Sequence, residues 1–333
     1  HCYEFGGDYY KKDKKNINGK LASNLTWNKK SNSYIIQHIL SGDSWLKNQD
    51  SPLNATAVNL SKGDEIYAIN GISFTHANSL YSELDGLANK KTTLKVKRKG
   101  KKDFESLIIK PLTNSANTAY REWVNKNQEF VHRKSNGKVG YLHIPDMSTK
   151  GFSEFYRHYL SEFRKDSIII DVRYNGGGNV SQLLLKMLKQ KVIGFDTTRH
   201  YGTDCYPQYA LAGNIICLTN EFAGSDGDIF SHSFKLMGLG KLIGKRTWGG
   251  VVGIWPRFGL MDGTFTTQPE FSFWFQDVGF GVENYGTEPD IDVEITPDNW
   301  IKGIDTQLER SISEALKGLK KTKLLKMDLK TRP

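Results

Sequence analysis

The sequence predicts an α/β protein that carries a smaller β-rich module. Over residues 113–333, apolar runs of strand length alternate with segments of helical periodicity, a pattern typical of helices layered on a sheet. Over residues 16–112, short alternating stretches are separated by turn residues, which indicates a compact β module. With 333 residues, the chain is long enough for about two domains and for a core that needs no disulfide or metal ion.

Within the β-rich module, the strands follow from alternation and from the turn signals between them. The dipeptide Asn70-Gly71 is a strong hairpin signal. Residues 77–87 carry leucines at helical spacing on one face, so a helix is predicted there. The predicted strands cover residues 33–40, 65–69, 93–98 and 106–109.

The α/β part begins with a helix, because apolar residues recur at helical spacing from Tyr120 to Val131. Residues 167–172 then form a continuous apolar run, as expected of a strand that is buried on both faces. The other strands are predicted at residues 139–144, 214–218 and 241–243, and the other helices at residues 151–163, 180–188, 226–237 and 304–319.

Charge and cysteine content argue against several classes of function. The net charge is +10, but the excess basic residues lie in residues 11–15, 95–102 and 317–333, without interleaved aromatic residues for base stacking. A solvated surface is therefore favoured over a nucleic-acid site. No stretch approaches the apolar length that spans a membrane. The cysteines at positions 2, 205 and 217 form no CxxC pair, so neither a zinc site nor a disulfide framework is predicted.

The stretch from Asn220 to Phe230 holds the best candidate for a nucleophile. A predicted buried strand ends just before it and a predicted helix begins inside it, so Ser225 lies at a strand-to-helix corner. A hydroxyl in such a position is exposed and has helix-terminal amides beside it, which can stabilise an oxyanion. The alternative interpretation is that Ser225 or Asp226 only caps the helix.

A second strand-to-helix junction carries three consecutive glycines, Gly176, Gly177 and Gly178. Such a loop lets the main chain approach a ligand closely and turn amide groups toward it. The segment matches neither the GxGxxG nor the GK[ST] fingerprint of nucleotide-binding proteins. Three interpretations stay open, namely an oxyanion-hole amide, a phosphate-binding loop and a plain tight turn.

In combination, these stretches resemble the tricorn family of serine peptidases, within the broader group of C-terminal processing peptidases. The resemblance covers residues 1 to about 318, with several long motifs in the family's order. The motifs that carry it are GYLHIPD at 140–146, IDVRYNGGG at 170–178, AGSDGDIF at 223–230, GLGKLIGKRTWGGVVGI at 238–254 and VENYGTEPDI at 282–291.

The β-rich module has a resemblance of its own. Residues 63–71 are similar to the central strand and turn of a PDZ domain, and the predicted helix follows in the expected place. PDZ domains commonly bind C-terminal peptides by strand addition to a sheet edge. A small β module that only packs or gates is the alternative interpretation.

The tricorn resemblance implies a catalytic set, residue by residue. The nucleophile falls on Ser225, the general base on His1 and the supporting carboxylate on Glu283. The main-chain amides of Asp226 and Gly178 would form the oxyanion hole. The family also uses a serine immediately before the histidine, a position upstream of His1.

Specificity and the choice of base involve further residues. The family places an acidic residue in its S1 pocket from the region after the glycine loop, and Asp196 is the nearest match. That assignment implies a preference for a basic P1 residue. The alternative is that Asp196 is a surface acid that balances Arg199. His143 and His232 lie near the motifs and compete with His1 as the base, although His232 is expected to be structural.

The implied function is a serine endopeptidase that cleaves oligopeptides through an acyl-enzyme and needs no cofactor or metal. The implied layout is an N-terminal stub of the catalytic core over residues 1–15, a PDZ-like domain over residues 16–112, and a crotonase-like catalytic core with a basic tail over residues 113–333. The implied partners are peptides or unfolded polypeptides, with assembly as a homo-oligomer and with neither nucleic acid nor a membrane span.

Family members carry β-propeller domains and a helical segment upstream, so the chain is expected to be a C-terminal portion of a longer protein. The resemblance favours a cytoplasmic location, with a periplasmic or secreted protein as the alternative. Two other functions compete with peptidase activity. The chain could be a catalytically inactive peptidase fold that binds peptides, or a scaffold that acts through its PDZ-like module.

Overall fold

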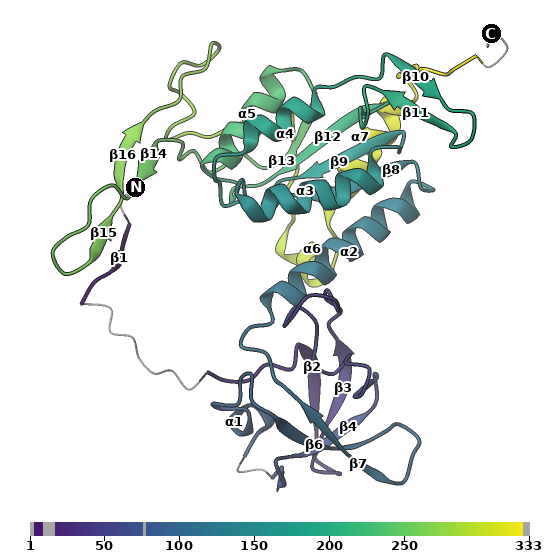
Figure 1. The fold of residues 1–333 in the computed structure, drawn as a ribbon, viewed down its shortest axis with the longest axis vertical. Coiled ribbons are helices and arrows are strands. Elements are labelled where there is room, and N and C mark those ends of the chain that lie inside the picture. Colours follow the sequence, from purple (N-terminus) through teal and green to yellow (C-terminus); the bar gives the residue numbers. More distant parts are fainter. Residues whose placement is uncertain (1–2, 9–16, 76–77, 329–333) are drawn as a thin grey trace. The chain divides into compact units, whose positions relative to one another are not determined.

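Two compact units make up the computed structural model, which describes residues 3–8, 17–75 and 78–328 (Figure 1). One unit comprises residues 11–126, and the other comprises residues 127–333 together with the N-terminal strand β1 (Glu4–Gly6). The boundary between the units falls within helix α2 (Ala116–Lys134). Among the described residues, no helix combines the length and the apolar character needed to cross a bilayer.

The smaller unit is built on an antiparallel sheet with the strand order β2-β3-β4-β6-β7, and β5 pairs with β4. Ile36, Ile66 and Leu94 alternate with less buried neighbours and are completely buried in its core, as the period of two predicts. The elements are β2 (Ser23–Asn28), β3 (Ser33–Ile39), β4 (Glu65–Ile69), β5 (Ile72–Ser73), α1 (Leu80–Glu83), β6 (Thr92–Lys97) and β7 (Phe104–Ile109).

Helix α1 is much shorter than the helix predicted over residues 77–87, so that prediction was wrong in extent. The Ser79 hydroxyl accepts a hydrogen bond from the Ser82 amide at 3.2 Å and caps the first turn. A few residues later, Gly86 takes φ +64°, which is incompatible with a continuing right-handed helix. The leucines of this segment still reach the core, so its apolar face is buried without a long helix. Residue 77 lies outside the described residues.

The larger unit is organised around a five-stranded parallel sheet with the order β17-β13-β12-β9-β8. Every residue of β8 and β9 is buried, which confirms that the apolar runs are interior strands. In Figure 1, α3, α4 and α5 lie in front of the sheet and α7 lies behind it. The prediction of a mixed α/β fold is confirmed. The elements are β8 (Val139–His143), α3 (Thr149–Glu162), β9 (Ser167–Asp171), α4 (Ser181–Leu188), β12 (Asn214–Thr219), α5 (Asp226–Leu236), β13 (Gly240–Gly244), β17 (Ile291–Asp292), α6 (Pro297–Ile301) and α7 (Thr306–Leu319).

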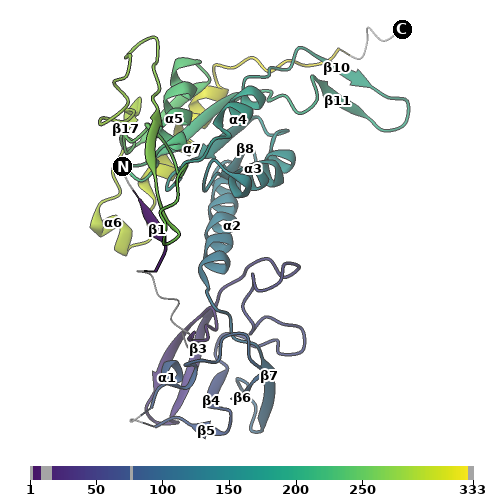
Figure 2. The ribbon, with the colours of Figure 1, turned by 60° about the vertical axis from the view of Figure 1, so that its left-hand side comes forward.

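Three two-stranded sheets accompany this core, and none of them was predicted. Strand β1 pairs with β15 (Thr264–Thr266), β10 (Gly194–Thr197) pairs with β11 (Thr203–Tyr206), and β14 (Gly253–Trp255) pairs with β16 (Gln268–Phe271). Both ribbon views place the β10–β11 hairpin on the side of the unit opposite to β14 and β16 (Figures 1 and 2). The parallel sheet therefore has an added β segment on either side.

Candidate active site

Ser225 occupies the predicted strand-to-helix corner, because β12 ends at Thr219 and α5 begins at Asp226. Its backbone has φ +55° and ψ −121°, a conformation that costs a residue with a side chain about 1–3 kcal/mol. The Ser225 side chain makes no capping hydrogen bond, which removes the interpretation that it serves only as a helix cap. Among the described residues, the corner thus presents a partly exposed hydroxyl without a hydrogen-bond partner.

The glycine loop packs directly against this corner. Gly177 has φ +84°, and a Cβ atom placed there would lie 2.5 Å from the Cβ atom of Ser225. A Cβ atom on Gly178, at φ +150°, would overlap the carbonyl oxygen of Met147. Both positions therefore need glycine for close packing, and the loop is more than a plain tight turn.

Two main-chain amides, one in the glycine loop and one next to Ser225, have no acceptor among the described residues. Gly176 donates to a main-chain carbonyl at 3.2 Å, and Gly177 donates to the side-chain oxygen of Asn175 at 2.9 Å. Within the described part of the chain, the amides of Gly178 and Asp226 donate to no group. A phosphate cradle needs several converging amides, and this loop leaves one of three available. One amide from each junction matches the chemistry of an oxyanion hole.

Two buried carboxylates fix the loops around Ser225. Asp226 accepts hydrogen bonds from the amide and the hydroxyl of Ser181, at 3.0 and 2.5 Å, at the start of α4. Asp228 accepts from the amides of residues 249 and 250, at 2.8 and 3.4 Å, and from the Ser225 amide. Burial raises the pKa of both carboxyl groups, and the hydrogen bonds that they accept oppose the shift. The corner is thereby tied to α4 and to the loop before β14.

Glu283 holds the next two residues of that same loop. Its Oε2 atom accepts hydrogen bonds from the amides of Val251 at 2.6 Å and Val252 at 2.8 Å. Its Oε1 atom accepts none from the described residues. Because Asp228 binds residues 249 and 250, one continuous loop is anchored by Asp228 at one end and by Glu283 at the other. The structure therefore connects Glu283 to the Ser225 corner through this loop.

His1, the predicted base, lies outside the described residues. The strand that follows it is placed, because β1 pairs antiparallel with β15. The Tyr3 amide also donates to the hydroxyl of Thr267 at 2.8 Å, and the Thr267 amide donates to the Tyr3 carbonyl at 2.9 Å. Residues 253–271 follow directly on the loop bound by Glu283, so the N-terminal strand is attached to the continuation of that loop.

The two competing histidines have structural surroundings. His143 is 2% exposed, its Nε2 donates to the Arg173 carbonyl at 2.8 Å, and burial lowers its pKa. The Nε2 atom of His232 lies 3.1 Å from a carboxylate oxygen of Asp277, and its ring packs against Phe275 at a centroid distance of 4.4 Å. Neither ring makes a hydrogen bond to the Ser225 hydroxyl among the described residues.

Asp196 is not brought to the Ser225 corner within this chain. It is an exposed residue of β10, directly opposite Asp204 of β11. This hairpin lies on the side of the unit opposite to β14 and β16 (Figure 2), and no described contact joins Asp196 to Ser225 or Glu283. No described ion pair joins Asp196 to Arg199 either, so the interpretation of Asp196 as a balancing surface acid gains no support.

Comparison with known proteins agrees with this geometry. A sequence model of peptidase family S41 matches residues 138–293, and a model of the tricorn protease PDZ domain matches residues 19–114. The tricorn protease of Thermoplasma volcanium is 43% identical to this chain over 324 residues. The chain belongs to the tricorn-type S41 peptidases. The family and the PDZ domain predicted from the sequence are thereby confirmed.

Other tricorn proteins match over the same extent. The tricorn protease homolog of Saccharolobus solfataricus is 45% identical over 320 residues, which cover 96% of this chain and 29% of the relative. The Thermoplasma volcanium alignment covers 97% of this chain and 31% of the relative. A crystal structure of the tricorn protease superposes with a TM-score of 0.90 at 42% identity, over 96% of this chain and 31% of that one. This tricorn-type chain thus spans about a third of the length of the relatives it matches.

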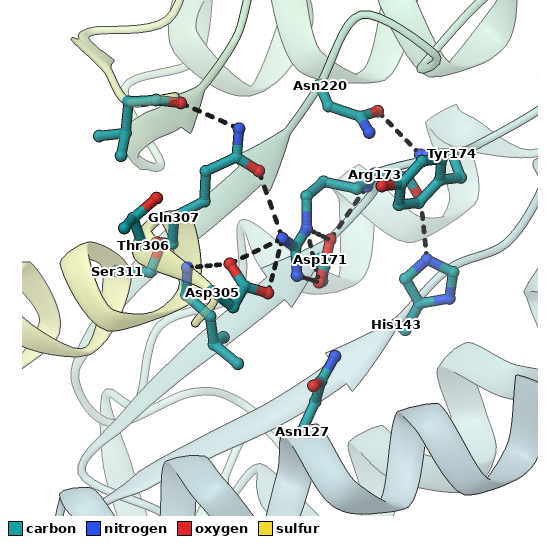
Figure 3. Close-up of polar contacts among 12 residues, drawn as sticks. Asn127, His143, Asp171, Arg173, Tyr174, Asn220, Asp305, Thr306, Gln307 and Ser311 are labelled. Carbon is teal, nitrogen blue, oxygen red and sulfur yellow. Dashed lines mark hydrogen bonds and ion pairs between the residues drawn. The ribbon is translucent and has the colours of Figure 1, made fainter. Parts of the chain in front are cut away.

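A buried network centred on Arg173 precedes the glycine loop of the peptidase unit (Figure 3). The guanidinium donates to Asp171 from Nη2 at 2.8 Å and to Asp305 from Nη1 at 2.8 Å. Asp305 in turn caps α7 by accepting from the Leu308 amide at 2.9 Å. Burial raises the pKa of Asp171, but the charge and hydrogen bonds of Arg173 outweigh it and hold that pKa below its ordinary value. The network joins the end of β9, where the glycine loop begins, to the start of α7.

Sequence reasoning on the tricorn-type motifs missed the roles of Asp228 and Arg173. Both residues lie inside motifs that were quoted for the family resemblance. The available signal was a charged residue within an otherwise apolar or glycine-rich stretch, since such a residue is rarely buried without a partner. The partners themselves are loop amides and a distant carboxylate, which no local pattern marks.

Proposed function

We propose that this chain is a serine endopeptidase that cleaves oligopeptides through an acyl-enzyme formed on Ser225. The observation that carries the proposal is the corner itself. Among the described residues, a hydroxyl without a partner is held at positive φ beside two amides that lack acceptors, those of Gly178 and Asp226. Acyl transfer needs this combination of an exposed nucleophile and preorganised donors for the developing oxyanion.

The proposed reaction has two halves. The Ser225 oxygen attacks the carbonyl carbon of the scissile bond while its proton passes to the base, which the family resemblance assigns to His1. The carbonyl oxygen becomes an oxyanion that accepts hydrogen bonds from the amides of Gly178 and Asp226. The C–N bond breaks as the imidazolium protonates the leaving amine. Water, deprotonated by the same base, then hydrolyses the ester and restores the Ser225 hydroxyl.

Glu283 is proposed as the carboxylate that orients the base and stabilises its charged form. Its Oε2 atom is fixed by the amides of Val251 and Val252, and its Oε1 atom accepts no hydrogen bond from the described residues. That oxygen can accept a hydrogen bond from the hydroxyl that the family places before the histidine. The resemblance assigns that base to His1, and the described strand β1, which begins three residues later, pairs with β15.

The finer features of the family resemblance belong to this proposal. We propose a crotonase-like catalytic core that includes the N-terminal strand β1, supported by the helix-covered parallel sheet and by the pairing of β1 with β15. A basic P1 residue recognised by Asp196, assembly as a homo-oligomer and a cytoplasmic location are proposed on the resemblance. The substrates would be oligopeptides or unfolded polypeptides.

A fluorophosphonate probe tests the nucleophile directly. We expect the chain to be labelled at Ser225 alone, as located by peptide mass, and a Ser225→Ala variant to remain unlabelled and to lose about 10⁴-fold or more of any turnover. Labelling elsewhere, or normal turnover in Ser225→Ala, would reject the assignment. If folded protein is not labelled, the reaction is repeated on a chain extended upstream, where continued absence of labelling would indicate an inactive peptidase fold.

A further inference from the structure

The PDZ unit contains a hollow that no step of the proposed catalysis uses. It has a volume of about 650 Å³ and opens between the loop of residues 44–58 and the end of β7. Strand β7 is an edge strand of its sheet (Figure 2), so the hollow lies beside backbone that carries no further strand. Every lining residue belongs to this one unit. The hollow is therefore a feature of the PDZ unit by itself.

The rim of the hollow exposes apolar side chains. Trp45 is 78% exposed and Ile108 is 65% exposed, and Leu46 beside Trp45 is also exposed. A lone exposed apolar residue is ordinary, but several around one concave site are typical of a binding surface. Tryptophan in particular supplies a large contact area with few rotatable bonds. These residues can hold an apolar side chain of a partner.

The charge of the lining is positive and unbalanced. The side chains of Lys47, Lys91 and Lys110 line the hollow, and none of them makes an ion pair or a hydrogen bond with the residues that the structure describes. The acidic lining residue, Asp50, accepts hydrogen bonds at one carboxylate oxygen from Gly42, Ser51 and Asn54 at 2.8–2.9 Å, and its single negative charge offsets only one of the three lysines. The hollow thus presents three free cations around its apolar rim, which complement a partner with carboxylates.

The loop that forms one wall is held by buried contacts. Asp43 and Arg121 form an ion pair at 3.1 Å with both side chains buried, directly before the rim. At the other end, the Ser51 hydroxyl donates to the Leu21 carbonyl at 2.6 Å, and Leu53 lies in the core. A wall fixed at both ends requires little ordering when a partner binds, which favours affinity.

We propose that this hollow binds an extended polypeptide segment in which carboxylates flank an apolar residue. The apolar residue packs against Trp45 and Ile108, and the carboxylates pair with Lys47, Lys91 and Lys110. Every residue that lines the hollow belongs to the PDZ unit, so binding here requires no residue of the Ser225 corner. The site would hold acidic polypeptides on the PDZ unit independently of the active site.

Fluorescence anisotropy with the full chain carrying Ser225→Ala tests the proposal without cleavage. The probe is a short labelled peptide with aspartates and glutamates around one phenylalanine. We expect saturable binding that weakens as salt is added, because exposed charges are screened. A peptide with every acid replaced by lysine should not bind, and one with the phenylalanine replaced by serine should bind about tenfold more weakly.

Matched variants test whether the peptide binds in this hollow. Trp45→Ala, and separately Lys91→Glu with Lys110→Glu, should each weaken binding about tenfold. The control variants are Trp300→Ala in the other unit and the pair Lys101→Glu with Lys102→Glu at the opposite end of β7. They carry equivalent changes and should leave the affinity for the peptide within about twofold. All substituted side chains are exposed, and thermal unfolding checks that each variant is folded. The proposal would be overturned if the two lysine-pair variants lost the same amount of affinity for the peptide. Tighter binding of a single-stranded oligonucleotide through the same residues would also overturn it.

Discussion

Ser225 holds its partly exposed hydroxyl at the strand-to-helix corner in a strained backbone conformation. A φ of +55° turns the residue out of the strand before α5 begins, and Asp228 and Gly177 hold it there from two sides. Strain of this kind persists only where neighbouring contacts outweigh it. In the proposed reaction, the residues around Ser225 would therefore act by fixing the position of its hydroxyl.

Gly177 offers a sharp test of this positioning. A Gly177→Ala substitution would put a Cβ atom 2.5 Å from that of Ser225, and it would strain the backbone at φ +84° by about 1–2 kcal/mol. We expect kcat/KM to fall about 100-fold, because a displacement of about 1 Å at a reacting group has that effect. Peptide hydrolysis and thermal unfolding are measured together.

The matched control is Gly137→Ala. Gly137 has φ +74°, so alanine there strains the backbone about as much as alanine at position 177. No atom lies within 4 Å of the added Cβ atom at position 137. The Gly177 variant should lose more stability, because its added Cβ atom also overlaps Ser225, and it alone should lose activity. Parallel losses of activity in the two variants would show that strain, and not contact with Ser225, is responsible.

The buried pair of Arg173 and Asp171 predicts a pH-dependent stability. An Arg173→Met variant leaves the completely buried Asp171 without its cation, so we expect a loss of about 3–5 kcal/mol near neutral pH. In the native protein the folded-state pKa of Asp171 lies below its unfolded value, so its contribution is present above about pH 4 and is lost as the pH falls. In the variant, unopposed burial raises that pKa. The difference in unfolding free energy between the two proteins should therefore grow from about pH 3 to about pH 6.

Denaturant titrations across this pH range measure the difference. A double variant, Asp171→Asn with Arg173→Met, removes the titrating group and should recover part of the lost stability. The difference in unfolding free energy between this double variant and the native protein should depend less on pH. If the difference in unfolding free energy between Arg173→Met and the native protein stays constant between about pH 3 and pH 6, this would contradict a role for the ionised Asp171.

At the scale of elements, the β10–β11 hairpin carries the proposed specificity. If Asp196 recognises a basic P1 residue, Asp196→Asn should reduce cleavage after lysine or arginine by about tenfold more than cleavage after leucine. Asp204→Asn is the matched control, because it removes the same charge from the facing strand. Peptide libraries that differ only at P1 give the ratio of cleavage after lysine or arginine to cleavage after leucine. A loss that is equal for basic and apolar P1 residues would reject the assignment.

Elements with a continuous apolar run were predicted well, and short polar elements were not. Strands β8, β9 and β12 and the helices between them were found from sequence because burial on both faces demands apolar residues throughout. The paired strands β10–β11 and β14–β16 contain no buried residue, so their sequence carries little periodicity. Helix α1 was overestimated because leucines at helical spacing can also reach a core from a turn.

At the scale of the whole molecule, the proposed homo-oligomer can be tested through exposed aromatic and apolar side chains of the β14–β16 segment. They include Trp255, Phe258, Met261 and Phe271. Exposed apolar side chains are frequent at protein interfaces when they gather in one patch. We expect light scattering at micromolar concentration to give a mass above that of one chain, and Phe258→Ser with Met261→Ser to lower it. A monomeric mass at all concentrations would contradict assembly of this chain.

Local sequence patterns were enough to recognise the α/β core, the Ser225 corner and the glycine loop, since each depends on neighbouring residues and on burial. The partners of the site residues depend on residues far apart in the chain. Arg173 pairs with Asp305, and Asp228 binds the loop at residues 249 and 250. A hydrogen bond or ion pair forms only where folding brings donor and acceptor within about 3 Å, and no local pattern encodes that distance. The tertiary structure alone decided which amides at the two junctions have no acceptor among the described residues.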